Sequence, residues 1–299
     1  MAAPVRTEAQ PEEEAATVAA ASLAGVPALG GAARVQALQR AIGNRATARL
    51  IADRRTLARR SVHSDKDLFN MMEKFRSKNS HLTEAEQNKI FWSVKKATDS
   101  DEVAWKFFDY YSGAFGYKIK KMAGAKLDNA RKTKTLAETK PSDDTYLDPD
   151  VFSLSDESLG PLLLHEFAHT GHHTNFMGAY DFEEGQAYAV EYFYAEHTGD
   201  TARMTKIIGI ISLAGARWGA NQEAATKENF RVAYVLMTEL AKLTRAGSST
   251  LKPLAGKSGD DGRLMAADFV AGFNALSAEL QALWDYIKAN LSSFTFPAV

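Results

Sequence analysis

The feature that most constrains this chain is a pair of histidines, His165 and His169, set four residues apart in an apolar segment. Leu162–Leu164, Phe167 and Ala168 supply the apolar residues around them. On an α-helix, residues four apart lie on one face about one turn from each other. The segment therefore predicts a buried helix that presents both imidazoles on the same side.

The limits of this helix are expected at Ser158 and Thr170. Ser158 is suited to cap the helix, which places Pro161 in the first turn, where proline is tolerated. Gly171 is expected to end the helix, because glycine readily adopts the conformation found just past a helix C-terminus. The histidine pair then lies in the last turns of the helix.

The five residues from His165 to His169 have the form HExxH. Two imidazoles at this spacing can bind one zinc ion at roughly 2.0–2.1 Å. A glutamate directly after the first histidine, here Glu166, lies beside the metal and can accept a proton from water that the metal activates. The chain has no cysteine, so any metal must be held by histidine, aspartate or glutamate. The motif predicts a Zn²⁺ site with His165 and His169 as ligands and Glu166 as general base.

A catalytic zinc site needs a third protein ligand, and Glu184 is the main candidate. It lies fifteen residues after His169, near the start of a helix expected over Phe182–His197. Gly185 and Ala187 are small, so we expect this helix to pack closely against the HExxH helix. Two histidines and one glutamate form a known catalytic zinc set with one position left for water.

Different roles for Glu184 and its neighbours remain open. Asp181 and Glu184 have the spacing of a capping box, so Glu184 could serve the helix end. Glu191, seven residues on along the same face, could accept a hydrogen bond from a ligand's ring nitrogen or form a salt bridge in the core. The alternative third ligands are Glu183, His172, His173 and Glu191.

A residue that stabilises the negative charge of a tetrahedral intermediate is also expected. Tyr188 lies one turn past Glu184 and faces the metal if Glu184 does, so we predict this role for it. The alternatives are Tyr180, Tyr192, His172, His173 and His197. Trp218 and the aromatic cluster from Phe107 to Tyr111 are expected to pack in the core.

The remaining pattern from residue 63 predicts a mainly α fold of the α+β type with a small edge sheet. Asp144–Phe152 alternates apolar and polar residues and predicts a short edge strand, which Pro149 limits. Residues 117–142 are expected to be irregular, and residues 246–262 to form a loop. Further helices are expected over 65–75, 83–97, 100–111, 201–217, 228–245 and 266–291.

The first 62 residues differ in composition from the rest. Residues 1–31 have no aromatic residue and predict a disordered leader. Residues 32–62 predict a basic helical docking or export segment, because eight arginines in 32–60 are opposed only by Asp53. Residues 63–299 are expected to form the catalytic domain.

Two segments resemble known families. His165–His169 followed by Glu184 resembles the gluzincin pattern of zinc metallopeptidases, which implies a zincin-like fold and peptide-bond hydrolysis. The metzincin spacing is absent, because position 175 is asparagine, and the thermolysin-like form differs in having aspartate where this chain has Tyr188. Val35–Leu50, with Leu38-Gln-Arg and Gly43-Asn-Arg-Ala at its centre, resembles a segment of proteins associated with bacterial extracellular contractile injection systems.

These resemblances imply a protein or peptide substrate and docking to an injection particle through residues 32–60. The formal net charge of -1 gives no reason to expect nucleic acid as a partner, and no segment is apolar enough to predict a membrane span. The start of the chain has no signal-peptide pattern, so we expect synthesis in a bacterial cytoplasm and release or delivery by the particle. The alternatives are an amidase acting on a non-peptide bond and a structural or adhesive part of the particle.

Overall fold

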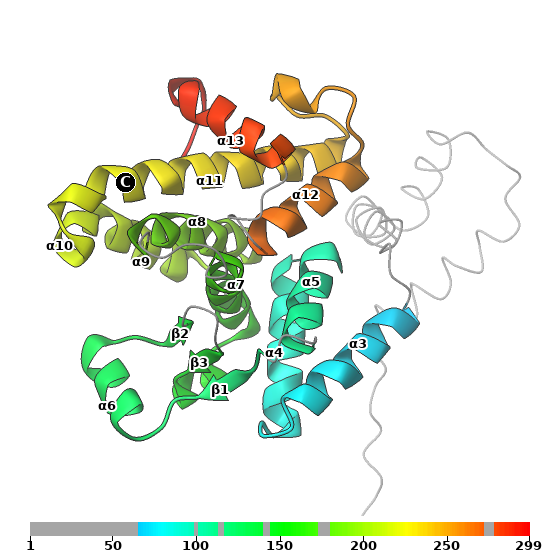
Figure 1. Cartoon of the computed structure of the whole chain (residues 1–299), viewed down its shortest axis with the longest axis vertical. Coiled ribbons are helices and arrows are strands. Elements are labelled where there is room, and N and C mark those ends of the chain that lie inside the picture. Colours follow the sequence, from blue (N-terminus) through cyan, green and yellow to red (C-terminus); the bar gives the residue numbers. More distant parts are fainter. Residues whose placement is uncertain (1–64, 99–100, 113–116, 140–143, 173–179, 272–277) are drawn as a thin grey trace, which may run out of the picture. The chain divides into compact units, whose positions relative to one another are not determined.

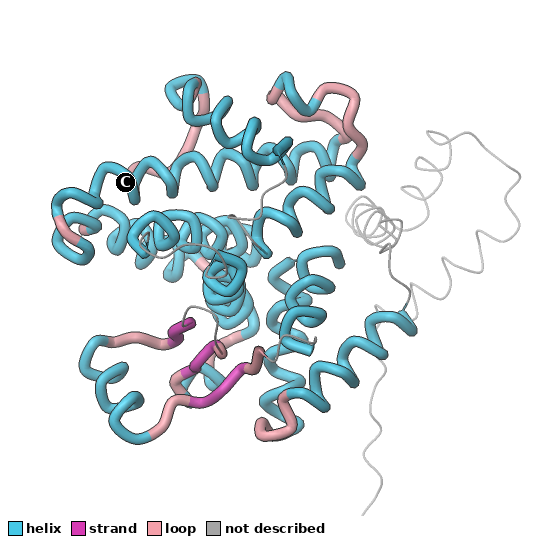
Figure 2. The backbone as a smooth tube through the Cα atoms, in the orientation of Figure 1, coloured by secondary structure: helices cyan, strands magenta, loops and turns pink. Residues whose placement is uncertain are grey.

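The computed structural model describes residues 65–98, 101–112, 117–139, 144–172, 180–271 and 278–299. The chain divides into two compact units, Met1–Arg60 and Ser61–Val299, and all described residues belong to the second. This unit is mainly helical with one small sheet (Figures 1 and 2). The leader expected over 1–31 and the basic helix expected over 32–62 lie outside the described residues.

Helices make up most of the described residues, and one of them begins with a capping box. Thr83 forms a capping box with Glu86: the Thr83 N–H donates to Glu86 Oε2 at 2.8 Å, and the Glu86 N–H donates to Thr83 Oγ1 at 3.3 Å. The described α-helices are α3 (Asp65–Lys78), α4 (Glu84–Thr98), α5 (Asp101–Ser112), α6 (Gly124–Thr133), α7 (Asp156–His172), α8 (Tyr180–Thr198), α9 (Thr201–Ser212), α10 (Ala214–Trp218), α11 (Ala220–Ala246), α12 (Gly259–Ala271) and α13 (Ala278–Ala289).

The sheet has the order β1-β3-β2, with β1 (Ile119–Lys121) parallel and β2 (Ala137–Thr139) antiparallel to β3 (Thr145–Leu147). The strand expected over Asp144–Phe152 exists as β3, but it is the central strand, and a 3-10 turn follows it from Pro149. The edge strands β1 and β2 lie in 117–142, which we expected to be irregular, as does α6. Each strand has three residues, too few for alternation of side chains to stand out in a sequence.

Helix α7 lies between the sheet and the layer that contains α8 and α11 (Figure 1 looks almost along α7). The sheet lies on one side of α7, α4 on another, and α8 on a third. Phe167, in the middle of α7, is fully buried, and its ring lies 5.1 Å from that of Phe107 on α5. The expected aromatic core around Phe107 is thus confirmed, and it fixes the rotation of α7 about its axis.

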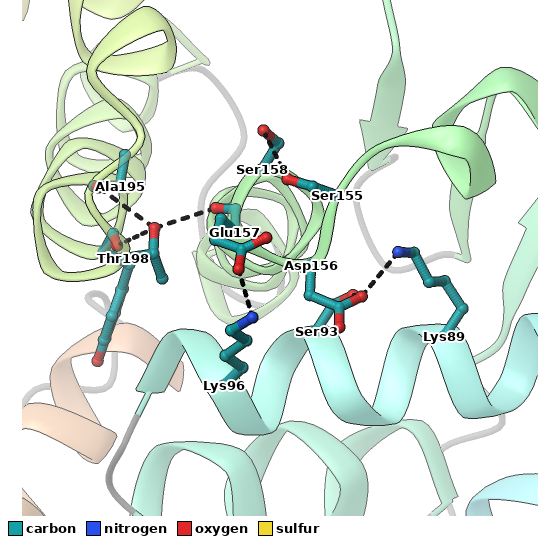
Figure 3. A network of polar contacts seen from close by, with 10 residues as sticks. Lys89, Ser93, Lys96, Ser155, Asp156, Glu157, Ser158, Ala195 and Thr198 are labelled. Atoms are coloured by element: carbon teal, nitrogen blue, oxygen red, sulfur yellow. Dashed lines mark hydrogen bonds and ion pairs between the residues drawn. The ribbon is translucent and has the colours of Figure 1, made fainter. Parts of the chain in front are cut away.

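Polar contacts fix the N-terminal half of α7 (Figure 3). Helix α7 begins at Asp156 rather than Ser158, so Pro161 lies in the second turn and not the first. Proline there cannot donate to the Glu157 carbonyl, and the Thr198 hydroxyl of α8 donates to that carbonyl instead, at 3.1 Å. Lys89 of α4 pairs with Asp156 at 2.7 Å. These contacts join the N-terminal half of α7, which precedes the histidines, to α4 and α8.

Two glycines allow helices to approach closely. A Cβ at Gly160 of α7 would lie 2.2 Å from the Ser93 carbonyl oxygen of α4. A Cβ at Gly185 of α8 would lie 2.4 Å from the Thr226 carbonyl oxygen of α11. The close approach at Gly185 is therefore to α11 rather than to α7, although α8 does pack against α7 as expected.

Replacing Gly160 with alanine is expected to lower the free energy of unfolding by about 2 kcal/mol or more, because the new methyl group meets backbone that cannot move easily. The matched control is Gly209→Ala in α9, where nothing lies within 4 Å of the added Cβ. There alanine should raise the free energy of unfolding by roughly 0.5–1 kcal/mol through helix propensity. Urea denaturation of both variants measures this, and equal shifts would refute the close α4–α7 contact.

Three further expectations need correction. Helix α7 continues through Gly171 to His172, so Gly171 does not end it. The helix expected over 201–217 is broken at Leu213 into α9 and α10. The long helix expected over 266–291 is two helices, α12 and α13, and α12 begins inside the loop expected over 246–262. In the described part of the chain, no helix combines the length and apolar character needed to cross a bilayer.

Candidate metal centre

The Nε2 atoms of His165 and His169 face each other at 3.1 Å, one turn apart on α7. Glu184 of α8 completes the group: Oε2 lies 3.8 Å from His165 Nε2, and Oε1 lies 3.7 Å from His169 Nε2. One donor atom from each residue falls within a group no more than 4.8 Å across. The structure thus brings together the three residues that the sequence singled out as ligands.

The donor set and spacing suit a zinc ion. Tetrahedral coordination at 2.0–2.1 Å places two ligand nitrogens about 3.3 Å apart, close to the 3.1 Å between the two imidazoles. The carboxylate-to-nitrogen distances of 3.7 and 3.8 Å need only a small movement of the Glu184 side chain. The side chains of His165 and His169 are 7% and 10% exposed, whereas Glu184 is 25% exposed, so the site opens toward Glu184.

Glu191 lies behind His165, away from the other two donors. Its Oε2 is 3.1 Å from His165 Nδ1, and its other oxygen forms an ion pair with Arg203 of α9. Glu191 has no exposed surface. Of the two roles left open for it, the structure shows the buried salt bridge, and the approach to the His165 ring nitrogen is an ion-pair contact without hydrogen-bond geometry. Carboxylates in this position fix the ring and tautomer of a metal-binding histidine.

The charges around His165 favour a cation. Burial opposes a charge on this imidazole, yet the carboxylates of Glu191, Glu166 and Glu184 raise the pKa of His165 to about 9. The surrounding carboxylates therefore stabilise a positive charge at this buried ring. A divalent ion at the same place would replace that proton and satisfy the same carboxylates.

Glu166 is buried beside the histidines and receives a hydrogen bond from the sheet. Thr139 Oγ1 of β2 donates to Glu166 Oε2 at 2.7 Å and lies 3.2 Å from the Glu166 carbonyl oxygen. Burial raises the pKa of Glu166 to about 7, although His165 and the Thr139 hydrogen bond lower it. A carboxyl group with a pKa near neutrality can both accept and release a proton at neutral pH.

The hydroxyl of Thr139 is one of three hydroxyl groups connected by hydrogen bonds. Tyr111 Oη lies 2.6 Å from Thr145 Oγ1, which lies 3.0 Å from Thr139 Oγ1. Each hydroxyl has one proton to donate. Since Thr139 donates to Glu166, Thr145 donates to Thr139 and Tyr111 donates to Thr145. Three elements, α5, β3 and β2, thereby fix the position of one carboxylate.

Replacing Thr139 with valine is expected to lower kcat about tenfold or more for any reaction in which Glu166 is the base, because a hydrogen bond to a charged group contributes about 1.5–3 kcal/mol. The shape of the side chain is retained, and zinc content should not change. Thr139→Ser keeps the hydroxyl and should keep most of the activity. Steady-state kinetics on both variants tests this, and a valine variant with the original kcat would show that the contact is structural only.

A cleft of about 450 Å³ lies in front of these groups. Its floor is α7, one wall is formed by β2 and the preceding segment from Thr133, and the other by α8, α9 and α10. The three candidate ligands and Glu166 all line it. The candidate metal ligands are therefore accessible from a cleft that the edge strand β2 borders.

Tyr188 lines the same cleft, and its ring centroid is 4.4 Å from that of His165. Burial and nearby carboxylates raise the pKa of Tyr188, so its hydroxyl remains a donor at neutral pH. Tyr192 instead packs against Phe230 and Tyr234, and His197 contacts Arg245. The structure describes no side chain at five further candidate positions: Tyr180, His172, His173, Glu183 and the capping candidate Asp181.

Several residues of the cleft were not anticipated from the sequence. Thr139 belongs to no recognised sequence motif. The only signal for a strand is its position two residues after Ala137, on the same face. Arg203, Lys206 and Arg217 reach the cleft from α9 and α10, with no spacing relation to the HExxH motif. Trp218, expected as a packing residue, also lines it and lies 6.1 Å from the Tyr188 ring.

No family model, no curated protein and no solved structure matches the chain. The interpretation of the site therefore rests on its geometry.

Proposed function

We propose that this chain is a zinc-dependent hydrolase that cleaves peptide bonds, with His165, His169 and Glu184 as metal ligands and Glu166 as general base. The observation that carries the proposal is the convergence of one donor atom from each ligand residue within 4.8 Å, inside a cleft that Glu166 also lines. The resemblance to gluzincin metallopeptidases agrees with this ligand set, and a zincin-like fold is part of the same proposal.

Zinc bound there supplies Lewis acidity to the scissile carbonyl and makes water nucleophilic at neutral pH. Glu166 accepts a proton from the attacking water and then donates it to the leaving amine. Thr139 holds the carboxylate through a 2.7 Å hydrogen bond, and Glu191 holds the His165 ring from behind. The Tyr188 hydroxyl donates to the oxyanion that develops on the carbonyl.

Peptides are favoured as substrates because the cleft is bordered by an edge strand. β2 pairs with β3 on one side, so its other edge can hydrogen-bond to an extended chain. A non-peptide amide has no backbone to make such bonds. This difference separates the proposed peptidase from an amidase on the same centre.

The test is a proteome-derived peptide library incubated with the full chain, with cleavage read by mass spectrometry. We expect new peptide termini with zinc, none after chelation, and recovery when zinc is restored. Cleavage of simple amides alone would favour the amidase, and no cleavage of either would favour a structural or adhesive role. Delivery by a contractile injection particle remains a proposal based on Val35–Leu50, which lies outside the described residues.

A further inference from the structure

The wall of the cleft formed by α9 and α10 carries three cations: Arg203, Lys206 and Arg217. Arg203 is neutralised by its ion pair with the buried Glu191. Lys206 and Arg217 are exposed, and neither forms an ion pair with any of the residues that the structure describes. Two positive charges therefore face the cleft without a direct ion-pair partner in the described part of the protein.

These two cations influence each other across the wall. Partial burial and the neighbouring charges of Arg203 and Arg217 lower the pKa of Lys206, although the Glu191 carboxylate opposes this shift. Other lysines of the described unit do form ion pairs, for example Lys126 with Glu138 and Lys121 with Glu86. Like charges placed together without a partner are stabilised by an anion that binds between them.

One other exposed cation lines the cleft, Lys134, which precedes β2 on the opposite wall. Glu138 lines the opposite wall on β2, and Glu166 and Glu184 line the floor and the adjoining helix. An acidic group on a bound peptide is repelled by these carboxylates and attracted to the α9–α10 wall. Trp218, at the end of α10, adds a flat apolar surface beside the charges.

We propose that Lys206 and Arg217 form a subsite for a carboxylate of the substrate, so that the cleft selects acidic peptides. The inference rests on the proposed function and specifies its substrate class. The carboxylate can come from an aspartate or glutamate side chain or from a peptide C-terminus, because the two are chemically alike at this wall.

Binding to the zinc-free full chain tests the subsite without relying on hydrolysis. The probes are fluorescein-labelled alanine-rich decapeptides that carry either glutamate or glutamine at the central positions, each with a free or an amidated C-terminus. Fluorescence anisotropy gives Kd. We expect the glutamate peptides to bind about tenfold more tightly than the glutamine peptides, with a preference that weakens as salt rises.

The Lys206→Gln/Arg217→Gln double variant should lose this preference. The matched control, Lys74→Gln/Lys252→Gln, removes the same charge from exposed lysines outside the cleft and should keep it. If only amidation weakens binding, the subsite binds a peptide C-terminus. Equal affinity for all four peptides, no binding at millimolar peptide, or a preference that survives in the double variant would overturn the proposal.

The outcomes also separate this inference from the proposed function. An acidic preference in binding without any cleavage when zinc is present leaves the subsite in place and refutes the hydrolase. Cleavage of peptides without an acidic preference supports the hydrolase and refutes the subsite.

Discussion

Glu166→Gln is expected to lower kcat for peptide hydrolysis about 10²–10⁴-fold while the protein keeps its zinc. The glutamine amide has the same shape and can still accept the Thr139 hydrogen bond through its oxygen. It cannot take up a proton from water, because an amide is not a base at neutral pH. Rates measured with a peptide identified from the library, together with zinc content, test this.

A matched control for Glu166→Gln is Glu138→Gln. Glu138 lines the same cleft from β2, but it is paired with Lys126 at 3.0 Å and lies outside the group of candidate ligands. Its replacement should leave kcat within about twofold, in line with the small contribution of exposed ion pairs. If the Glu166 variant keeps full activity, Glu166 is not the base.

His169→Ala is expected to abolish stoichiometric zinc binding. Loss of a residue that only orients a ligand costs about 10–100-fold in metal affinity, and loss of a ligand itself should exceed that. Zinc per chain, measured by mass spectrometry after dialysis against a mild chelator, gives the result.

His197→Ala serves as the control for metal loss. His197 lies on α8, as Glu184 does, but its ring contacts Arg245 and it does not line the cleft. This variant should retain one zinc per chain. Circular dichroism of both variants distinguishes loss of metal from loss of fold, and a His169 variant that still binds one zinc tightly would contradict the ligand assignment.

The helix with the histidine pair was predictable because its chemistry is local. Residues four apart share a helix face whatever surrounds them, and the apolar residues around His165 identify the face that is buried. Glu184 could be proposed because it begins a second helical pattern close in sequence. The approach of the Glu184 carboxylate to both imidazoles depends on how α8 crosses α7. Residue spacing in the sequence does not predict that crossing.

The sequence-based expectations that failed also have specific structural causes. Pro161 was expected in the first turn, but Thr198 from another helix takes up the carbonyl that proline leaves free, so the helix begins earlier. Gly185 packs against α11, a helix more than thirty residues further along the chain. Thr139 reaches Glu166 through a sheet of three-residue strands. All three depend on contacts between segments distant in sequence, which local pattern does not contain.

The central claim is that one divalent ion is held between α7 and α8 by two imidazoles and one carboxylate. X-ray absorption at the zinc edge, on the full chain loaded with one equivalent of zinc, tests it most directly. We predict one tightly bound zinc with two imidazole nitrogens and oxygen ligands in its first coordination shell. No zinc retained after dialysis, or a coordination shell without imidazole, would contradict the account.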